Sequence, residues 1–203
     1  MARPSKAPER RAELVAAARH TVVERGVLNL KLRDVADHAG MSPGSLLYYY
    51  PSLSDLLEDV QQEAVERFCV AREAAVAAES DPRARMRAMI GSGLPNGKND
   101  ELCVLLYELG TIARREPAYA ARHIALYERQ VRGYVGILEA GAATGVFDLT
   151  DDPVTIARNL VTLEDGYGLH LTQAVPPLDR SAAEAMVLSY ARVSTRCSLE
   201  VPA

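Results

Sequence analysis

Three side chains in one short segment have the chemistry needed to contact nucleic acid. Ser45, Tyr48 and Tyr49 lie between a predicted helix start at Ser42 and a stop at Pro51. Hydroxyl groups with no acid among them suit hydrogen bonds to phosphate oxygens and base edges. A helix that only supports a core usually carries Glu, Lys and Arg on its outer face. The composition therefore favours a helix that contacts DNA.

The elements around these side chains predict a helix-turn-helix. Leu32, Val35 and Ala36 have the i, i+3, i+4 spacing of one apolar helix face. Gly40 stands just past this helix, where the chain commonly takes a positive φ. Ser42-Pro43 then supplies an N-cap and a first helical residue. The second helix is about two turns long, too short to be stable alone, so it depends on packing and is there to be presented.

The segment resembles the DNA-binding part of TetR-type transcriptional regulators. Their pattern joins a helix ending in E-x-G to (I/V)-A-x-x-A-G-(V/M)-S-x-G-x-L-Y-x-Y-F and then to S-K-x-x-L-L. Over about the first 60 residues the match consists of Glu24-Arg25-Gly26, Val35-Ala36, Ala39-Gly40-Met41-Ser42, Gly44, Leu46, Tyr49-Tyr50, Ser52 and Leu56-Leu57. The segment Leu163–Leu171 is similar to the choline-regulator-like branch. The resemblance implies a homodimeric repressor that binds a palindromic double-stranded DNA operator and responds to a small-molecule effector.

The short helix and the resemblance together predict the residues that contact DNA. Two positions depart from the family pattern, since Leu47 replaces a usual Tyr and Leu53 a usual Lys that contacts phosphate. We therefore expect a moderate number of phosphate contacts. The predicted DNA-binding residues are Lys31, Arg33, Ser42, Pro43, Gly44, Ser45, Tyr48, Tyr49 and Ser52.

The distribution of charge supports this prediction, although the net charge of −4 taken alone argues against nucleic acid. Residues 1–50 hold eight bases and five acids and so carry +3, which leaves −7 on residues 51–203. The positive end is the one that holds the helix-turn-helix, as binding to phosphates requires. Candidate phosphate contacts there are Arg10, Arg11, Lys31 and Arg33.

The composition favours a folded protein of the cytoplasm. With 203 residues, 48% of them hydrophobic, the chain can bury the core of one or two domains. No apolar run is long enough to span a membrane, and the polar start MARPSKAPERR lacks the apolar region of a signal peptide. Cys69, Cys103 and Cys197 are far apart and lie in apolar helical patterns, which predicts buried free thiols. We expect no membrane partner.

The rest of the chain shows helical periodicity and no alternation typical of strands. An apolar stripe predicts a long helix from about Ser54 to Ala78. We expect an all-α protein of about nine helices: a helix-turn-helix DNA-binding domain at 1–53, with its motif at about 31–50, and a helical ligand-binding and dimerisation domain at 54–203. Further helices are separated by Ser80-Asp81-Pro82, Glu116-Pro117, Asp151-Asp152-Pro153 and Pro176-Pro177.

Signatures of enzymes and metal sites are missing from the sequence. The four His residues lack ligand spacing, and no G-x-S-x-G, phosphate loop or dinucleotide fingerprint occurs. Glu164-Asp165 and Asp151-Asp152 are adjacent pairs whose members point to different helix faces, so neither is a catalytic dyad. We expect no catalytic residue, metal or cofactor. A helical protein-interaction module without DNA binding is the alternative, and an enzyme with a helical pocket is less favoured.

Aromatic and sulfur-containing side chains recur in the core stripes of the C-terminal two-thirds. Ordinary packing explains any one of them, but buried Tyr hydroxyls need partners, and several Tyr together can line a ligand cavity. The resemblance favours such a pocket and leaves the ligand unidentified. The candidates are Phe68, Met86, Met89, Tyr107, Tyr127, Tyr134 and Tyr167.

The last two helices are expected to form the dimer. Helix 153–174 is apolar around much of its circumference, and its mid-helix Gly166 and Gly168 each cost up to about 1 kcal/mol unless another helix approaches closely. Helix 180–198 offers small residues that permit close packing. We predict a two-fold four-helix contact that includes Leu160, Leu163, Tyr167, Leu171, Ala185, Met186, Ser189 and Val193.

Overall fold

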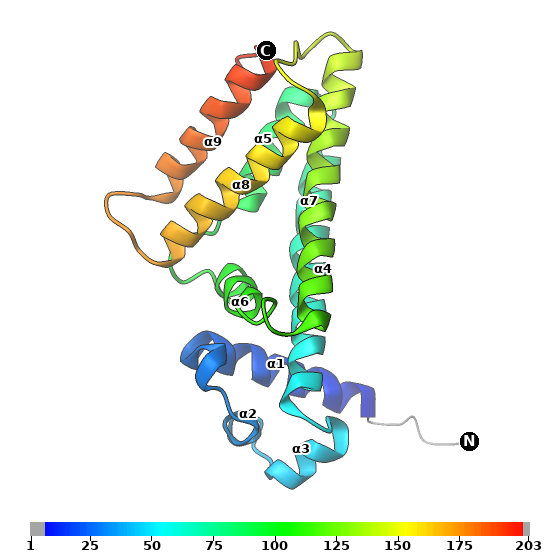
Figure 1. Cartoon of the computed structure of the whole chain (residues 1–203), viewed down its shortest axis with the longest axis vertical. Coiled ribbons are helices and arrows are strands. Elements are labelled where there is room, and N and C mark those ends of the chain that lie inside the picture. Colours follow the sequence, from blue (N-terminus) through cyan, green and yellow to red (C-terminus); the bar gives the residue numbers. More distant parts are fainter. Residues whose placement is uncertain (1–6, 201–203) are drawn as a thin grey trace, which may run out of the picture. The chain divides into compact units, whose positions relative to one another are not determined.

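The expected all-α fold is confirmed by the computed structural model, which describes residues 7–200 (Figure 1). These residues form nine α-helices and one short 3-10 helix, and none of them lies in a strand. The helices are α1 (Ala7–Arg25), η1 (Val27–Asn29), α2 (Leu32–His38), α3 (Pro43–Tyr49), α4 (Leu53–Ala77), α5 (Pro82–Gly93), α6 (Glu101–Gly110), α7 (Pro117–Ala143), α8 (Pro153–Thr172) and α9 (Arg180–Thr195).

The chain divides into two compact units. The first contains Met1–Val65 with Val104–His123, and the second contains Glu66–Cys103 with Ile124–Ala203. This division differs from the boundary expected at residue 53, because the first half of α4 and parts of α6 and α7 belong with the N-terminal helices.

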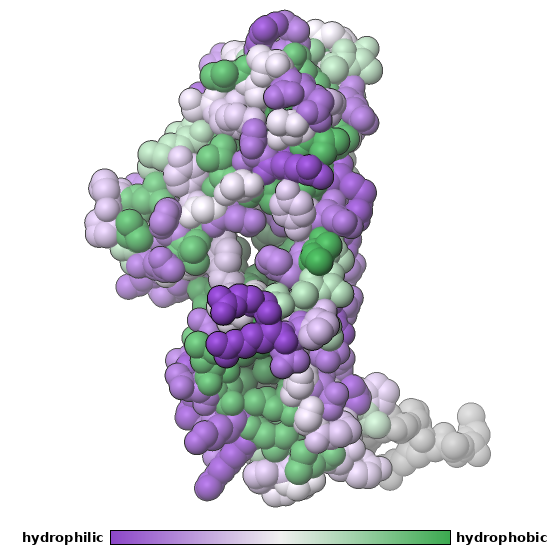
Figure 2. All heavy atoms as spheres, viewed as in Figure 1, coloured by the Kyte–Doolittle hydropathy of each residue, from purple (hydrophilic) through white to green (hydrophobic). Residues whose placement is uncertain are grey.

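Among the described residues, every helix is too short or too polar to cross a bilayer. Hydrophilic and hydrophobic residues are interspersed over the face drawn in Figure 2.

In the first unit, α1 packs against α2 and α3, and α2 packs against α3. The apolar faces predicted from helical spacing are the ones that become buried, because only they can leave water together. The buried side chains of these helices and their flanks include Leu14, Ala18, Val22, Val35, Ala36, Leu46 and Tyr50.

The turn between α2 and α3 has the geometry that its residues predict. Gly40 takes a φ of +65°, and the Met41 amide donates to the carbonyl of Ala36 at 2.9 Å. The Ser42 hydroxyl accepts the amide of Ser45 at 3.1 Å, as an N-cap does. The sequence signals for the end of α2 and the start of α3 are therefore confirmed.

Acidic N-caps begin three of the later helices. Asp81, Asp152 and Asp179 each accept backbone amides in the first turn of α5, α8 and α9. One boundary differs from expectation, because α6 ends at Gly110 and residues 111–115 continue only as hydrogen-bonded turns.

The core of the second unit is built where α8 and α5 pack against α9. Its buried apolar side chains come from α5, α7, α8 and α9, which accounts for the wide apolar faces seen in the sequence. They include Met86, Ile90, Tyr134, Leu138, Ile156, Leu160, Val187 and Ala191.

A buried ion pair crosses this unit. The side chains of Arg72 and Glu164 are 3% and 1% exposed, and Arg72 Nη2 lies 3.1 and 2.9 Å from the two carboxylate oxygens. Arg72 also donates to Oε1 of Gln130 at 2.7 Å and to the carbonyl of Met89 at 3.1 Å. The hydroxyl of Tyr134 donates to Glu164. One polar cluster therefore joins α4, α5, α7 and α8.

Burial sets the electrostatics of this cluster. It raises the pKa of Glu164 to about 7, although the charge of Arg72 and the hydrogen bond from Tyr134 lower it in part. The same desolvation raises the pKa of Tyr134 well above its ordinary value. Removing one partner from such a pair destabilises a protein by about 3–5 kcal/mol, because a buried charge is left uncompensated.

Gly93, the last residue of α5, has no room for a side chain. A Cβ atom there would lie 2.3 Å from Oε1 of Glu164 and 2.7 Å from Nη1 of Arg72. Both atoms are held by hydrogen bonds inside the core, so neither can move aside without breaking the cluster.

We expect Gly93→Ala to lower the free energy of unfolding by about 1–3 kcal/mol, because the new methyl group overpacks the ion pair. Gly136→Ala is the matched control, since a Cβ at this mid-helix position of α7 meets nothing within 4 Å. It should raise stability by about 0.5–1 kcal/mol. Urea unfolding followed by circular dichroism measures both. Equal urea midpoints for the two variants would show that the ion pair can move to accommodate the methyl group at no cost in stability.

Candidate functional site

Helix α3 presents a polar face to solvent and an apolar face to the core. Leu46 and Tyr50 are fully buried, as their i, i+4 spacing predicts. Tyr48 is 83% exposed, and Ser45 is also exposed. Tyr49 is half-buried and meets the ring of Tyr48 edge-on, with 5.2 Å between the centroids. The outer face of α3 therefore offers hydroxyl groups and no acid.

A shared carboxylate fixes the end of α3. The Tyr50 hydroxyl donates to Oδ2 of Asp59 at 2.7 Å, and Arg11 donates to the same oxygen at 2.9 Å. Arg11 also donates to the carbonyl of Tyr49 at 2.9 Å, and its guanidinium carbon lies 4.1 Å from the centroid of the Tyr50 ring. The hydrogen bond to Asp59 raises the pKa of Arg11, and burial raises that of Tyr50.

This cluster gives Arg11 a second role and adds a residue. The sequence predicts that Arg11 contacts phosphate, and in the structure its guanidinium binds the carbonyl of Tyr49 in α3 and the carboxylate of Asp59 in α4. Asp59 was missed because it lies 48 residues from Arg11 and has the appearance of an ordinary solvated acid on α4.

Three further basic residues of the first unit lie at its surface. Lys31 and Arg33 are exposed, and Arg33 is only 3.7 Å from Asp37 in a solvated i, i+4 pair. Arg10 forms a similar exposed pair with Glu13. Such pairs hold their partners weakly, so they leave these cations able to exchange to a phosphate.

The nine predicted DNA-binding residues all belong to the first unit. Eight of them are exposed, and Tyr49 is half-buried. Two of the hydroxyl groups also stabilise helix starts. The Ser42 hydroxyl caps α3, and the Ser52 hydroxyl accepts the amide of Asp55 at the start of α4. The surface is thus able to donate hydrogen bonds to phosphates and base edges without large rearrangement.

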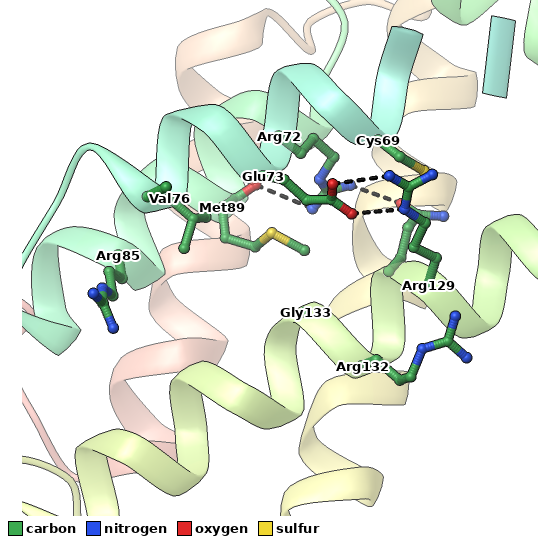
Figure 3. Close-up of a pocket in the computed structure, with 11 residues that line it drawn as sticks. Cys69, Arg72, Glu73, Val76, Arg85, Met89, Arg129, Arg132 and Gly133 are labelled. Atoms are coloured by element: carbon green, nitrogen blue, oxygen red, sulfur yellow. Dashed lines mark hydrogen bonds and ion pairs between the residues drawn. The ribbon is translucent and has the colours of Figure 1, made fainter. Parts of the chain in front are cut away.

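A pocket of about 350 Å³ lies in the second unit, between the second half of α4, α5 and α7 (Figure 3). Its volume is at the lower end of the range for small-molecule sites. Arginine is its most frequent lining residue. The lining consists of Cys69, Arg72, Glu73, Val76, Ala77, Arg85, Met89, Arg129, Gln130, Arg132 and Gly133.

Of the seven residues predicted to line a cavity, only Met89 lines this one. Phe68, Met86 and Tyr134 are buried by packing, and the Tyr134 hydroxyl is used by Glu164. Tyr127 and Tyr167 are half-buried at the edge of the core of the second unit, whereas Tyr107 belongs to the first unit. Three of the predicted residues are therefore buried in packing, three are half-buried away from this pocket, and no pattern in the sequence identifies the arginines that line it.

The surface predicted to form a dimer is partly available. Leu160 and Leu171 are buried in the core of their own subunit, which removes them from the predicted interface. Leu163 and Tyr167 are half-buried, and the exposed candidates are on α9. These are Ala185, Met186, Ser189 and Val193.

Two protein families match the chain, one near each end. Residues 14–60 match the family of bacterial regulatory proteins of the tetR type, and residues 82–193, more than half of the chain, match the C-terminal family of BetI-type transcriptional repressors. The HTH-type transcriptional regulator BetI of Agrobacterium fabrum is 25% identical over 191 residues, covering 90% of this chain and 86% of the relative. The HTH-type transcriptional repressor KstR2 of Rhodococcus jostii is 26% identical over 140 residues, or 68% of each chain.

Solved structures share the fold. A transcriptional regulator of Saccharomonospora viridis, solved in complex with choline, aligns with a TM-score of 0.84 at 21% identity, over 90% of this chain and 95% of that one. A TetR regulator of Haloarcula marismortui aligns with a TM-score of 0.83 at 24% identity, over 92% and 98%. The matched families are regulators rather than enzymes, which decides against the enzyme alternative. The chain belongs to the TetR family of bacterial regulatory proteins, with a C-terminal part of the BetI type, and is a DNA-binding transcriptional regulator.

Proposed function

We propose that the protein is a ligand-responsive repressor that binds a palindromic operator as a homodimer. The observation that carries this proposal is the outer face of α3, on which Ser45 and Tyr48 are exposed while Leu46 and Tyr50 anchor the helix. A short helix held in this way can enter the major groove of DNA.

In this proposal each part of the predicted surface has a distinct task. Ser45, Tyr48 and Tyr49 contact base edges or nearby phosphates, and Lys31 and Arg33 contact the DNA backbone. Arg11 acts indirectly, because its bonds to Tyr49 and Asp59 hold α3 in place.

A single helix-turn-helix has too little surface for tight specific binding, so two must act together on half-sites about one DNA turn apart. The apolar side chains exposed on α9 support pairing through the last two helices. Val193 is 68% exposed and Met186 is 45% exposed, and both lie on the same helix. Leu169 of α8 is exposed as well.

The pocket of the second unit is the proposed effector site. The BetI-type match of residues 82–193 supports a sensing role for this unit. An effector alters DNA affinity only if it binds the DNA-bound and free conformations unequally. Helices α4, α6 and α7 each contribute residues to both units, so three continuous helices can carry that difference.

The first test concerns the outer face of α3. We expect Tyr48→Ala to weaken binding to the DNA upstream of the protein's own gene about tenfold, with little loss of thermal stability, because an exposed side chain contributes to contact rather than to packing. Fluorescence anisotropy with labelled DNA measures the affinity.

The matched control for this test is Leu28→Ala, which truncates a side chain of the same unit that is 81% exposed but lies outside the helix-turn-helix. It should leave DNA affinity unchanged. If Leu28→Ala weakens binding as much as Tyr48→Ala, or Tyr48→Ala unfolds the protein, the assignment of the α3 face is wrong.

A second test uses salt. Each phosphate contact contributes about 0.9 to the slope of log affinity against log salt concentration, so Lys31→Gln should lower the slope by roughly 2 in a dimer. Lys98→Gln removes a charge that is also exposed but lies in the second unit, and it should leave the slope unchanged. An affinity indifferent to salt in the wild-type protein would contradict the electrostatic argument.

A third test concerns the dimer. The double variant Met186→Glu, Val193→Glu places charges on the exposed face of α9 and should give helical monomers with much weaker operator binding. Val70→Glu adds a charge at a comparably exposed apolar position on α4 and should remain dimeric. Light scattering after size exclusion measures the mass. A wild-type monomer at micromolar concentration would exclude the proposed assembly.

A further inference from the structure

The acidic side chain of the pocket is already paired with an arginine. Glu73 is the one carboxylate among the lining residues described above, and both its oxygens accept hydrogen bonds from Arg129, at 2.6 and 2.8 Å. These bonds lower the pKa of Glu73. Arg129 also donates to Glu66 at 2.8 Å. A cationic ligand would therefore have to compete with a well-placed guanidinium for this carboxylate.

The polar groups that remain are donors. Arg72 can only donate, so the atom of Gln130 that faces it at 2.7 Å is the amide oxygen. The amide nitrogen of Gln130 is thereby turned away from Arg72, and no described residue accepts a hydrogen bond from it. Nε of Arg72 is buried and has no acceptor among the described residues. Both side chains line the pocket, and the amide nitrogen of Gln130 is the donor that a ligand there can reach.

Arg85 supplies a charge that no carboxylate in the described part of the chain neutralises. Its Nε donates to the carbonyl of Glu79 at 2.8 Å, which anchors the side chain and leaves the two terminal nitrogens without a described partner. Arg85 lies at one end of the pocket and Arg129 and Arg132 lie at the other (Figure 3). In the described part of the chain, Arg132 lies 3.7 Å from a carboxylate oxygen of Glu128 in an exposed pair.

The wall between these ends is apolar and contains no aromatic ring. Val76 and Met89 lie between Arg85 and Arg129 in Figure 3, and Gly133 faces them from α7. A quaternary ammonium ion is usually held by aromatic faces, which this lining lacks. The choline bound to the regulator of Saccharomonospora viridis is thus a poor guide to the ligand of this pocket.

We infer that the pocket binds an organic anion with one apolar arm, its carboxylate or phosphate head at Arg85 and its arm along Val76 and Met89. The inference rests on the proposed function in assigning the effector to the second unit, and it names the chemical class of that effector. A guanidinium with free terminal nitrogens suits bidentate binding of such a head.

The test uses four probes of similar length or charge with the full-length protein. Octanoate and octyl phosphate carry the two candidate heads on the same arm, octyltrimethylammonium carries a cation on that arm, and choline carries the cation alone. Isothermal calorimetry in the absence of DNA measures their affinities. We expect both anions to bind more tightly than either cation, and the tighter of the two identifies the head.

Variants locate the head and the arm. Arg85→Gln should weaken binding of the tighter anion about tenfold or more, and Arg85→Lys should restore part of it because the charge returns. Arg87→Gln removes a neighbouring exposed charge of α5 that does not line the pocket and should bind like the wild type. Gly133→Leu should block binding, because the new side chain would fill the space beside Met89, whose Cε lies 2.8 Å from where even a Cβ would stand.

The inference is overturned if neither anion binds in the millimolar range, if a cation binds as tightly, or if Arg85→Gln and Arg87→Gln behave alike. Circular dichroism of each variant confirms that it is folded. Operator binding is measured separately: failure of the wild type to bind DNA contradicts the proposed function, while the calorimetry still tests the ligand class. An anion that binds without releasing DNA contradicts the effector role alone.

Discussion

A guanidinium and a carboxylate with almost no access to water govern the second unit. Arg72 cannot be hydrated where it lies, so its charge requires Glu164, and their close approach requires that position 93 be glycine. The same guanidinium orients Gln130, whose amide nitrogen then becomes a donor at the pocket. The donor character of the pocket is thus a consequence of the interaction that holds its walls together.

The first unit uses a similar pair under different conditions. Asp59 binds both Arg11 and Tyr50, but the side chains of Arg11 and Asp59 are 45% and 46% exposed. Water screens this pair, so its net contribution to stability is small. Its importance is positional, because it determines where α3 ends and hence which hydroxyls remain outside. The second unit therefore needs its ion pair for stability, whereas in the first unit the ion pair positions α3.

Sequence reasoning succeeded where the determinants are local. The caps Ser42 and Asp152, and the burial of Leu46, follow from neighbours within four residues. It did not identify the partners of Arg11 or the arginines that line the pocket, because charged residues on amphipathic helices have the pattern of solvated faces until partners far along the chain are known. The hydroxyl of Tyr134 shows the same limit: its need for a partner was foreseen, but not that Glu164 would supply it. Similarly, α8 has apolar residues around much of its circumference, which predicted that Leu160 and Leu171 lie in a dimer interface. Both instead complete the core of the second unit.

The separation of 92 residues between Arg72 and Glu164 has a consequence for biosynthesis. A chain emerges from the ribosome N-terminus first, so Arg72 appears long before its carboxylate and cannot be buried without leaving a lone charge in the interior. The brace of α3, by contrast, has all its members once Asp59 has emerged. A nascent chain therefore holds all the residues that fix the end of α3 while the ion pair of its second unit is still incomplete, and only a nearly finished polypeptide is able to complete that pair.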